Sequence, residues 1–241
     1  MIYAILAAGN GERLQQEGLL QPKPLVKVGG EAILDRLVRI SASNGADEIW
    51  VISNAGMTSV KEHLQALQAS MKTLRDTELH FIEAQTPSSS HSLEVLSKHM
   101  PAQPFILTTV DTIFREAEFA EYVAAFQRHL DEGSDALMGI TRYVDDEKPL
   151  YVSIDGNATV TGFHDSQPTP PTPYVSAGIY GLTPQAVQTL YRCLAQGNSR
   201  MRNYQRALLD EGLKVKAYTF GDVIDIDHIS DIQHAEKLIR Q

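Results

Sequence analysis

The chain is poor in cysteine and carries a net negative charge. Cys193 is the single cysteine among 241 residues, so no disulfide can form within the chain and no residue pattern indicates an oxidising compartment. The formal net charge of −9 disfavours binding to a nucleic-acid backbone or an anionic membrane, because those surfaces attract basic patches. We therefore expect a cytoplasmic protein that binds neither nucleic acid nor membrane.

The apolar start of the chain, Met1–Ala8, has neither the length of a membrane span nor the basic leader of a signal peptide. It ends at Gly9, and we interpret it as a buried first strand. The overall composition is ordinary for a globular protein, with 43% hydrophobic and 21% charged residues. A chain of 241 residues with this composition can bury one large α/β core or two small ones.

Short apolar runs rich in β-branched residues alternate with helix-like stretches over the first half of the chain. The runs that predict strands are Tyr3–Leu6, Glu48–Ser53, Leu79–Glu83 and Phe105–Val110. Strands that alternate with helices form βαβ units, in which parallel strands are buried between helices. We predict a Rossmann-like α/β fold, with a mostly parallel sheet flanked by helices.

One helix can be predicted in more detail from its apolar spacing. The residues that would share its buried face are Ile33, Leu34, Leu37 and Val38. The charged residues between them are Asp35, Arg36 and Arg39. We expect all three charged side chains to point to water.

After about residue 135 the pattern changes to hairpin-like strands. The predicted strands are Leu150–Ile154, Thr159–Phe163 and Tyr174–Tyr180. The prolines between residues 168 and 173 predict an extended loop, which either covers a substrate or is an inert connection. We predict one domain, residues 1–241, in which this part forms a small antiparallel extension.

The first strand leads directly into a loop of small residues. Its members are Leu6, Ala7, Ala8, Gly9, Asn10 and Gly11. Small residues let backbone N–H groups approach a ligand, and the following helix presents the positive end of its dipole, which suits a triphosphate. A tight turn from strand to helix needs the same glycines for structural reasons, so the loop alone leaves both interpretations open.

A lysine between two prolines follows this loop. Pro22 and Pro24 restrict the backbone on either side of Lys23 and can hold it in a defined place. The glycine loop, Arg13 and this lysine together resemble the signature of the nucleotidyltransferase family that includes the sugar-1-phosphate nucleotidylyltransferases, or nucleoside-diphosphate-sugar pyrophosphorylases. The combination is much more specific than either half.

The resemblance implies both a fold and a reaction. The fold is that of the nucleotide-diphospho-sugar transferases, with a nucleotide-binding half over about residues 1–134 and an acceptor-binding half over 135–241. The reaction transfers a nucleoside monophosphate from a triphosphate to a phosphorylated small molecule, such as a sugar 1-phosphate, and releases pyrophosphate. The backbone of Leu6–Gly9 would border the base and ribose, while Arg13 and Lys23 would neutralise the triphosphate and the departing pyrophosphate.

Three aspartates are candidate metal ligands. Asp111 falls at the end of the strand that finishes at Val110, at the sheet edge where α/β folds bind ligands, although a helix cap is an alternative role. Asp225 and Asp227 would share one face of a strand, where a bound divalent cation would relieve their repulsion. The resemblance implies Mg²⁺ bound by Asp111 and by Asp227 or Asp225, and we favour Asp227.

Two further segments resemble substrate contacts of the family. Ser176, Ala177 and Gly178 match its substrate-side strand, with serine where sugar-using members often have asparagine. Ser90, His91 and Ser92 lie in a hydroxyl-rich segment that replaces a Gly-Thr-Ala-like turn near the base. A polar surface loop and a glycine that only eases packing are the competing explanations.

The sequence departs from sugar-using members where a Glu-Lys-Pro triplet is expected after the hairpin. Glu147-Lys148-Pro149 precedes the hairpin instead, and we interpret it as an exposed turn. Three arginines, Arg200, Arg202 and Arg206, could reach an acceptor phosphate, although a basic helix face is the simpler interpretation.

These departures leave two alternatives open: a cytidylyltransferase acting on a non-sugar phosphate such as phosphocholine, and a non-catalytic nucleotide-binding regulator. An NAD-dependent dehydrogenase is disfavoured, because the acidic ribose partner expected about 20 residues after the glycines is missing.

Overall fold

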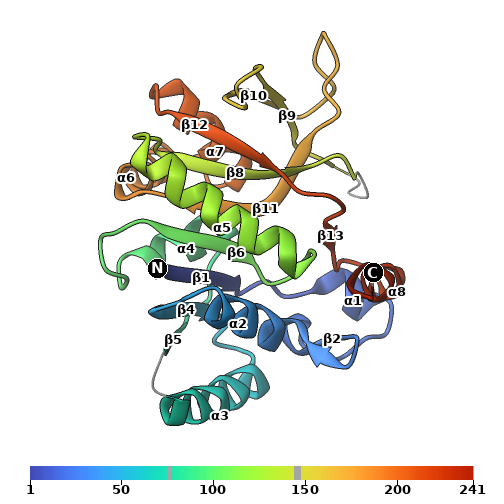
Figure 1. Cartoon of the computed structure of the whole chain (residues 1–241). Helices are drawn as coiled ribbons and strands as arrows, with labels where there is room; N and C mark the ends of the chain where they lie inside the picture. Colours follow the sequence, from blue (N-terminus) through green and yellow to red (C-terminus); the bar gives the residue numbers. More distant parts are fainter. Residues whose placement is uncertain (75–76, 144–147, 241) are drawn as a thin grey trace.

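The computed structural model describes residues 1–74, 77–143 and 148–240, and over these ranges the chain forms one central sheet with helices on both faces (Figure 1). The strand order is β10-β9-β11-β6-β1-β4-β5, with β8 paired to β11 and β12 paired to β8. β1 (Ile2–Ala7), β4 (Glu48–Ser53), β5 (Glu78–Glu83) and β6 (Phe105–Thr109) are parallel to one another. The predicted Rossmann-like parallel sheet is therefore confirmed.

The second half of the chain adds the mixed part of the sheet. Its strands are β8 (Ala136–Thr141), β9 (Tyr151–Ile154), β10 (Val160–His164), β11 (Val175–Leu182) and β12 (Val215–Thr219). β9 and β10 form the predicted hairpin, and β11 runs antiparallel to both β6 and β8. The sequence analysis missed β8 and β12, which lie beside β11, whereas β11 itself joins this extension to the main sheet through β6.

β1 divides the core because its side chains alternate between the two faces of the sheet. Tyr3, Ile5 and Ala7 pack on one face, with α2 (Ile33–Ser43), α3 (Thr58–Leu74), α5 (Glu116–Asp131) and α8 (Ile229–Ile239). Ile2, Ala4 and Leu6 pack on the other face, with α4 (Ser89–Ser97), α6 (Pro184–Ala195) and α7 (Met201–Asp210). Helices on both faces explain why β1 is apolar at every position.

The predicted helix over residues 33–39 is α2, and its four apolar residues are buried as expected. The expectation for Arg36 is wrong, since this side chain is only 6% exposed. Its guanidinium donates to the carbonyl oxygen of Phe114 over 3.1 Å and forms an ion pair of 2.8 Å with Glu116. Arg36 is buried because these two acceptors replace its water.

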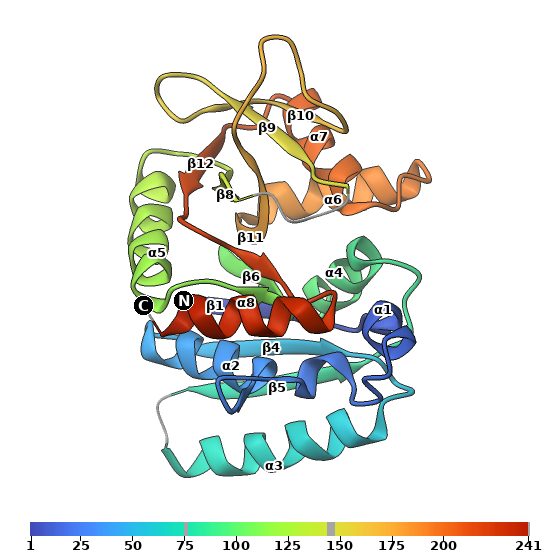
Figure 2. The same ribbon diagram turned by 90° about the vertical axis from the view of Figure 1, so that its right-hand side faces the viewer.

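The end of the chain returns to the nucleotide-side half. After β12 the chain forms β13 (Ile224–Asp225), which pairs with β7 (Thr112–Ile113) directly after β6. α8 then contacts β2 (Lys27–Val28), and Figure 2 shows it in front of β1. The side chain of Glu236 on α8 accepts a hydrogen bond from the N–H of Gly29, beside the β2–β3 hairpin (Lys27–Val28 and Glu31–Ala32). The last residues of the second half therefore pack against the first half.

The predicted strand over residues 223–228 is wrong beyond Asp225. The N–H of Asp227 donates to the carbonyl oxygen of Asp225 over 3.0 Å, which turns the backbone out of strand geometry. Asp225 and Asp227 therefore do not share one strand face. Among the described residues, no helix has both the length and the apolar composition needed to cross a bilayer.

Candidate functional site

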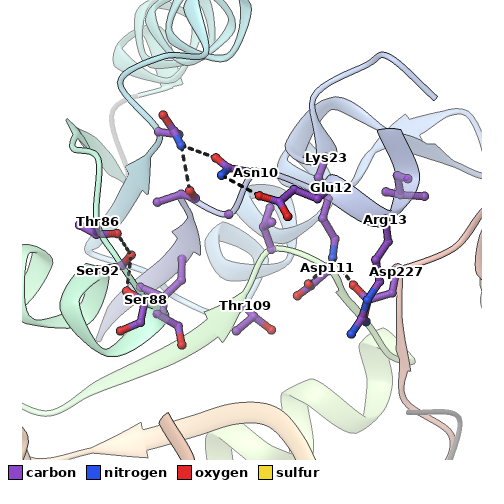
Figure 3. Close-up of a pocket in the computed structure, with 18 of the residues that line it drawn as sticks. Asn10, Glu12, Arg13, Lys23, Thr86, Ser88, Ser92, Thr109, Asp111 and Asp227 are labelled. Carbon is purple, nitrogen blue, oxygen red and sulfur yellow. Dashed lines mark hydrogen bonds and ion pairs between the residues drawn. The ribbon is translucent and has the colours of Figure 1, made fainter. Parts of the chain in front are cut away.

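A cleft of about 480 Å³ opens at the carboxyl ends of the parallel strands (Figure 3). Ligands of open α/β sheets bind at this edge, because the loops after the strands meet there. The lining side chains come from the loop after β1, the loop after β5 and the ends of β4 and β6. The residues that line the cleft are Leu6, Ala8, Gly9, Asn10, Gly11, Glu12, Arg13, Leu14, Lys23, Asn54, Gln85, Thr86, Pro87, Ser88, Ser89, Ser92, Thr109, Val110, Asp111 and Asp227.

The loop after β1 forms one wall of the cleft, as predicted from its small residues. Leu6, Ala8, Gly9, Asn10 and Gly11 line it, whereas the side chain of Ala7 is fully buried in the opposite core. Ala7 points away because successive side chains of a strand alternate between faces.

Asn54, at the end of β4, supports this loop. Its amide nitrogen donates to the carbonyl oxygen of Ala8 over 3.3 Å and to the side-chain oxygen of Asn10 over 2.8 Å. The sequence analysis missed Asn54, although it directly follows a parallel strand in the same way as Asp111 does. Its place after that strand could have identified it.

Lys23 enters the cleft from a one-turn helix, η1 (Lys23–Leu25), directly after Pro22. It packs against Gly11, whose φ of +65° is a backbone conformation that favours glycine. A Cβ atom at residue 11 would lie 3.1 Å from the Cβ of Lys23. The glycine therefore lets the loop after β1 approach the lysine closely.

Both predicted cations contact the predicted aspartates. The Lys23 Nζ lies 2.6 Å from Asp111 Oδ2 and 2.8 Å from Asp227 Oδ1. The Arg13 guanidinium lies 2.5 Å from Asp227 Oδ2. The chain thus brings together groups that are as many as 214 positions apart.

These contacts keep Lys23 and Asp111 ionised. Burial by itself would lower the pKa of the Lys23 ammonium, but the Asp111 and Asp227 carboxylates raise it above its ordinary value. Burial would raise the pKa of the Asp111 carboxyl, but Lys23 and a hydrogen bond from Thr109 hold it below its ordinary range. Lys23 is therefore a cation and Asp111 an anion at neutral pH.

Asp225 has a different environment from the other two aspartates. It accepts a hydrogen bond of 3.2 Å from the Thr112 hydroxyl. Asp225 as a residue is exposed, but the protein around its carboxyl group displaces water, and the like charges of Asp111 and Asp227 add to this effect. Together these causes raise the pKa of Asp225 to about 8. We retain Asp227 as the favoured partner of Asp111, because Lys23 contacts both of them.

The chemistry of Asp111 and Asp227, here called the acidic group, is compatible with Mg²⁺. Among the described residues, no three His, Cys, Asp or Glu side chains are arranged as a metal-binding group. Mg²⁺ in phosphate-transfer sites takes oxygen ligands, typically one or two carboxylates together with phosphate oxygens and water. Asp111 and Asp227 supply two carboxylates around one position, now next to the Lys23 ammonium.

The hydroxyl-rich segment reaches the cleft, but partly through residues other than those predicted. Ser92 lines the cleft and pairs with the Thr86 hydroxyl over 2.6 Å. Ser90 is fully buried, and His91 lies outside the set of lining residues, with its Nδ1 paired to the Ser88 hydroxyl over 2.9 Å. Ser88 caps α4 and lines the cleft, and its hydroxyl donates to the carbonyl oxygen of Ser199 over 2.5 Å.

Ser176, Ala177 and Gly178 lie on β11, next to the end of β6. Gly178 has a φ of +70°, and a Cβ atom there would lie 2.8 Å from the Thr112 hydroxyl and 2.9 Å from the Thr109 hydroxyl. Ala177 is buried, and the Ser176 hydroxyl accepts a hydrogen bond from Gln205 over 3.0 Å. This segment borders the acidic group but does not line the cleft described above.

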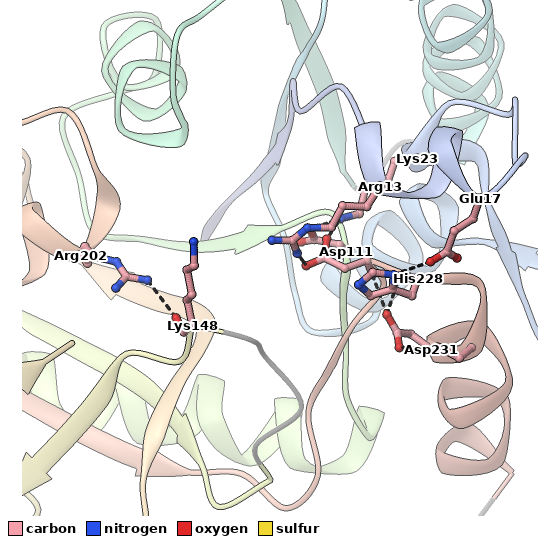
Figure 4. Close-up of polar contacts among 10 residues, drawn as sticks. Arg13, Glu17, Lys23, Asp111, Lys148, Arg202, His228 and Asp231 are labelled. Atoms are coloured by element: carbon pink, nitrogen blue, oxygen red, sulfur yellow. Dashed lines mark hydrogen bonds and ion pairs between the residues drawn. The ribbon is translucent and has the colours of Figure 1, made fainter. Parts of the chain in front are cut away.

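The arginines of α7 have partners away from the acidic group. Arg202 and Arg206 both form ion pairs with Asp165 at the end of the β9–β10 hairpin. Arg202 also donates to the carbonyl oxygen of Lys148 over 3.0 Å, and Figure 4 shows these two residues on the far side of the view from Arg13 and Asp111. Glu147, the first residue of the Glu-Lys-Pro triplet, lies outside the described residues.

Sequence reasoning also missed Glu17, which follows α1 (Glu12–Gln16). Its carboxylate accepts hydrogen bonds from the N–H of Ile229 over 2.8 Å and from His228 Nδ1 over 2.5 Å (Figure 4). The backbone N–H of Ile229 and the His228 ring hold the pKa of the Glu17 carboxyl below its ordinary value. No motif in the sequence marks this contact, because its partners are more than 200 residues apart.

Comparison with known proteins identifies what this chain resembles. The profile of a family described as "Nucleotidyl transferase" matches residues 3–241. The bifunctional protein GlmU of Alkaliphilus metalliredigens is 22% identical over 255 residues, covering 98% of this chain and 51% of that protein. The glucose-1-phosphate cytidylyltransferase of Salmonella typhimurium is 29% identical over 112 residues, covering 46% of this chain and 39% of that protein.

A solved structure has the same fold. The inositol-1-phosphate CTP transferase from T. maritima superimposes with a TM-score of 0.76 and 15% identity, covering 100% of this chain and 96% of that one. The chain spans about half the length of the GlmU relative and 39% of the cytidylyltransferase. The predicted fold class and family resemblance are confirmed by these comparisons.

Proposed function

We propose that this chain, which belongs to the nucleotidyl transferase family, transfers a nucleoside monophosphate from a nucleoside triphosphate to a phosphorylated small molecule, a sugar 1-phosphate being the first candidate. In this reaction an oxygen of the acceptor phosphate forms a bond to the α-phosphorus. The bond from the α-phosphorus to the β-phosphate bridging oxygen breaks, and pyrophosphate leaves with those electrons.

The observation that carries this proposal is the convergence of Arg13, Lys23, Asp111 and Asp227 on one position of the cleft. Phosphoryl-type transfer is catalysed mainly by alignment and by stabilisation of the developing charge. Lys23 and Arg13 supply two cations for the triphosphate and the departing pyrophosphate. An acceptor phosphate is already a nucleophile, so the reaction requires neither a covalent enzyme intermediate nor a dedicated general base.

The other residues of the cleft would orient the nucleotide. The backbone of the loop after β1 offers N–H groups beside the phosphates, and the hydroxyls of Ser88 and Ser92 offer hydrogen bonds near the base. Asp111 and Asp227 would hold Mg²⁺, which when bound neutralises phosphate charge. We place Ser176–Gly178 on the acceptor side because they lie next to Thr109 and Thr112.

A second acceptor class has specific support. A cytidylyltransferase that acts on a non-sugar phosphate, such as phosphocholine or an inositol phosphate, fits the end of the hairpin, where β10 finishes. That segment reads Gly162-Phe163-His164-Asp165 instead of Glu-Lys-Pro. Two of the similar proteins named above carry cytidylyltransferase or CTP transferase in their names. CTP is accordingly the first triphosphate to test with both acceptor classes.

The test is a pyrophosphate-release assay with Mg²⁺ across the four nucleoside triphosphates and a panel of phosphorylated sugars, inositols and aminoalcohols. We expect release with at least one pair, and near-complete loss in Asp111→Ala. Normal release by Asp111→Ala would contradict the assignment of this site. Tight nucleotide binding without release from any pair would favour the non-catalytic regulator.

A further inference from the structure

α1 contacts the segment that carries Asp227 at two points. Arg13 and Glu17 are four positions apart, which places them on the same side of this short helix. Arg13 contacts the Asp227 carboxylate, and Glu17 contacts His228 and the N–H of Ile229. A cation and an anion on α1 thus face an anion and a histidine on the returning chain.

Asp231 holds the same segment from the other side. Its Oδ2 accepts the N–H of Asp227 over 2.9 Å and the N–H of His228 over 2.6 Å, and the residue is 8% exposed. With the Glu17 contact, three consecutive backbone N–H groups, at residues 227, 228 and 229, donate to carboxylates. The backbone that presents Asp227 to the cleft is therefore fixed at each residue (Figure 4).

We propose that Glu17 and Asp231 are positioning residues, which keep Asp227 beside Asp111 once Arg13 and Lys23 turn to the phosphates of the nucleotide. This inference rests on the proposed function. In the structure, the ion pairs of Asp227 use the two cations that a triphosphate would attract. The contacts of Glu17 and Asp231 involve neither Arg13 nor Lys23, so they persist when these two cations leave Asp227 for the phosphates.

A purely structural role for Glu17 is the competing explanation, and the chain contains a matched control for it. Glu236 on α8 also accepts a backbone N–H from the nucleotide-side half, that of Gly29, over 3.3 Å. It lies away from Asp227, on the same helix that Glu17 contacts at its start. If Glu17 only fastened α8 to the domain, removal of either carboxylate would have the same consequence.

The first measurement is the Mg²⁺ dependence of pyrophosphate release in Glu17→Ala, Glu17→Gln and Glu236→Ala. Residues that orient metal ligands typically contribute about 10-fold to 100-fold in metal affinity or activity. We expect Glu17→Ala to raise the half-saturating Mg²⁺ concentration by about 10-fold, with a smaller change in the KM for the triphosphate. The half-saturating Mg²⁺ concentration of Glu17→Gln should lie between those of Glu17→Ala and the wild type, since its amide oxygen can still accept the N–H of Ile229. Glu236→Ala should match the wild type.

The second measurement is hydrogen exchange at the amides of residues 227–229 with nucleotide and Mg²⁺ present, which needs no turnover. We expect faster exchange in Glu17→Ala than in Glu236→Ala. Equal exchange and equal Mg²⁺ dependence in these two variants would overturn the inference. A wild-type protein without pyrophosphate release would contradict the proposed function instead, and the exchange result would still decide whether Glu17 fixes this segment.

A second variant, Asp231→Asn, tests the inference if Glu17→Ala does not fold. Asp231→Asn keeps an acceptor oxygen but removes the negative charge. We expect it to shift the Mg²⁺ dependence in the same direction as Glu17→Ala while the protein stays folded by circular dichroism. An unchanged Mg²⁺ dependence in folded Asp231→Asn would contradict the role of Asp231.

Discussion

The parts of the molecule that we propose bind the nucleotide and the acceptor, here called the nucleotide side and the acceptor side, both carry basic residues. These residues have different kinds of partners. Lys23 and Arg13 pair with Asp111 and Asp227 inside the cleft. Arg202 and Arg206 pair with Asp165, and each also donates to a backbone carbonyl oxygen, that of Lys148 or of Phe163. The first pairs lie in the cleft that we propose binds the nucleotide, whereas the second join α7 to the β9–β10 hairpin.

The difference indicates that the role of a lysine or arginine depends on whether its partner is a carboxylate in the cleft or a backbone carbonyl oxygen. A carboxylate that can bind a metal frees its lysine or arginine when a metal and a triphosphate enter together. A backbone carbonyl oxygen gains no other ligand, so the arginine that it binds stays where it is. We therefore expect the two sides to respond differently to loss of charge.

The largest expected effect is on turnover in Lys23→Ala. Loss of a preorganised donor to developing charge costs about 100-fold to 1,000-fold in kcat, and we expect at least that for pyrophosphate release. Arg202→Ala is the matched change on the acceptor side, and we expect its kcat to fall by less than about 10-fold. Equal loss in both variants would remove the distinction between the two sides. Circular dichroism checks that both proteins fold.

Next in size is the effect of Gly178→Ala on stability, where β11 of the acceptor side meets β6. The left-handed φ alone costs about 1 to 2 kcal/mol, and the new Cβ would also meet the hydroxyls of Thr109 and Thr112. Gly133 has a φ of +71° with no atom near its Cβ position, so Gly133→Ala measures the backbone cost without the contact. We expect chemical denaturation to show a larger loss of unfolding free energy for Gly178→Ala. Equal losses would mean that the threonines move aside at no cost.

A smaller effect is expected from Asp165→Asn. This change removes the shared partner of Arg202 and Arg206, which is itself largely exposed. Exposed ion pairs contribute about 0.2 to 1 kcal/mol, so thermal unfolding should shift only slightly. We expect the KM for the triphosphate to remain at the wild-type value. A changed KM for the triphosphate would show that the acceptor side acts on the nucleotide.

The smallest expected effect is on stability, and it concerns an ion-pair network that belongs to neither the nucleotide side nor the acceptor side. Glu116 accepts hydrogen bonds from Arg39 and pairs with Arg36, and these contacts hold the pKa of its carboxyl below the ordinary 4.5. A lowered folded-state pKa stabilises the protein above the unfolded value, and this contribution disappears as the pH falls through the folded-state value.

The corresponding measurement is thermal unfolding of Glu116→Gln against pH. The difference in Tm from the wild type should be largest near pH 7 and should shrink below about pH 4.5. Glu62→Gln, an exposed change on α3, should show no such trend. A difference in Tm that grows on acidification would contradict the direction assigned to Glu116.

Much of the fold and of the site could be predicted because their signals are local. The strand over Glu48–Ser53 has the same bounds in sequence and structure, since a run of apolar β-branched residues marks it directly. Arg13, Lys23 and Asp111 follow recognisable turns and strand ends. β8 was missed because its first four residues, Ala136–Gly139, are neither β-branched nor aromatic, so no β-rich run marks the strand.

Other parts of the site could not be predicted, because they depend on how the chain returns. His91 was selected as a histidine in a polar loop, but the cap of α4 pairs it with Ser88 and directs Ser88 to the cleft. Asp225 and Asp227 were expected on one strand face, but in the structure a turn after Asp225 separates them. Ligand, localisation and metal stay predictions, since the fold alone does not test them.

The sequence by itself determined the parallel sheet, the small-residue loop and the identity of the charged groups, because each depends on residues close together in the chain. Only the tertiary structure decided which charges meet. Lys23 pairs with Asp111 and Asp227, and Glu17 with His228, across 88 to 211 positions. Local periodicity carries no information about such pairs. The contacts of Asp227 and His228 form only when β13 and α8 return the end of the chain to the cleft, and the Lys23–Asp111 pair requires β6 to lie beside β1.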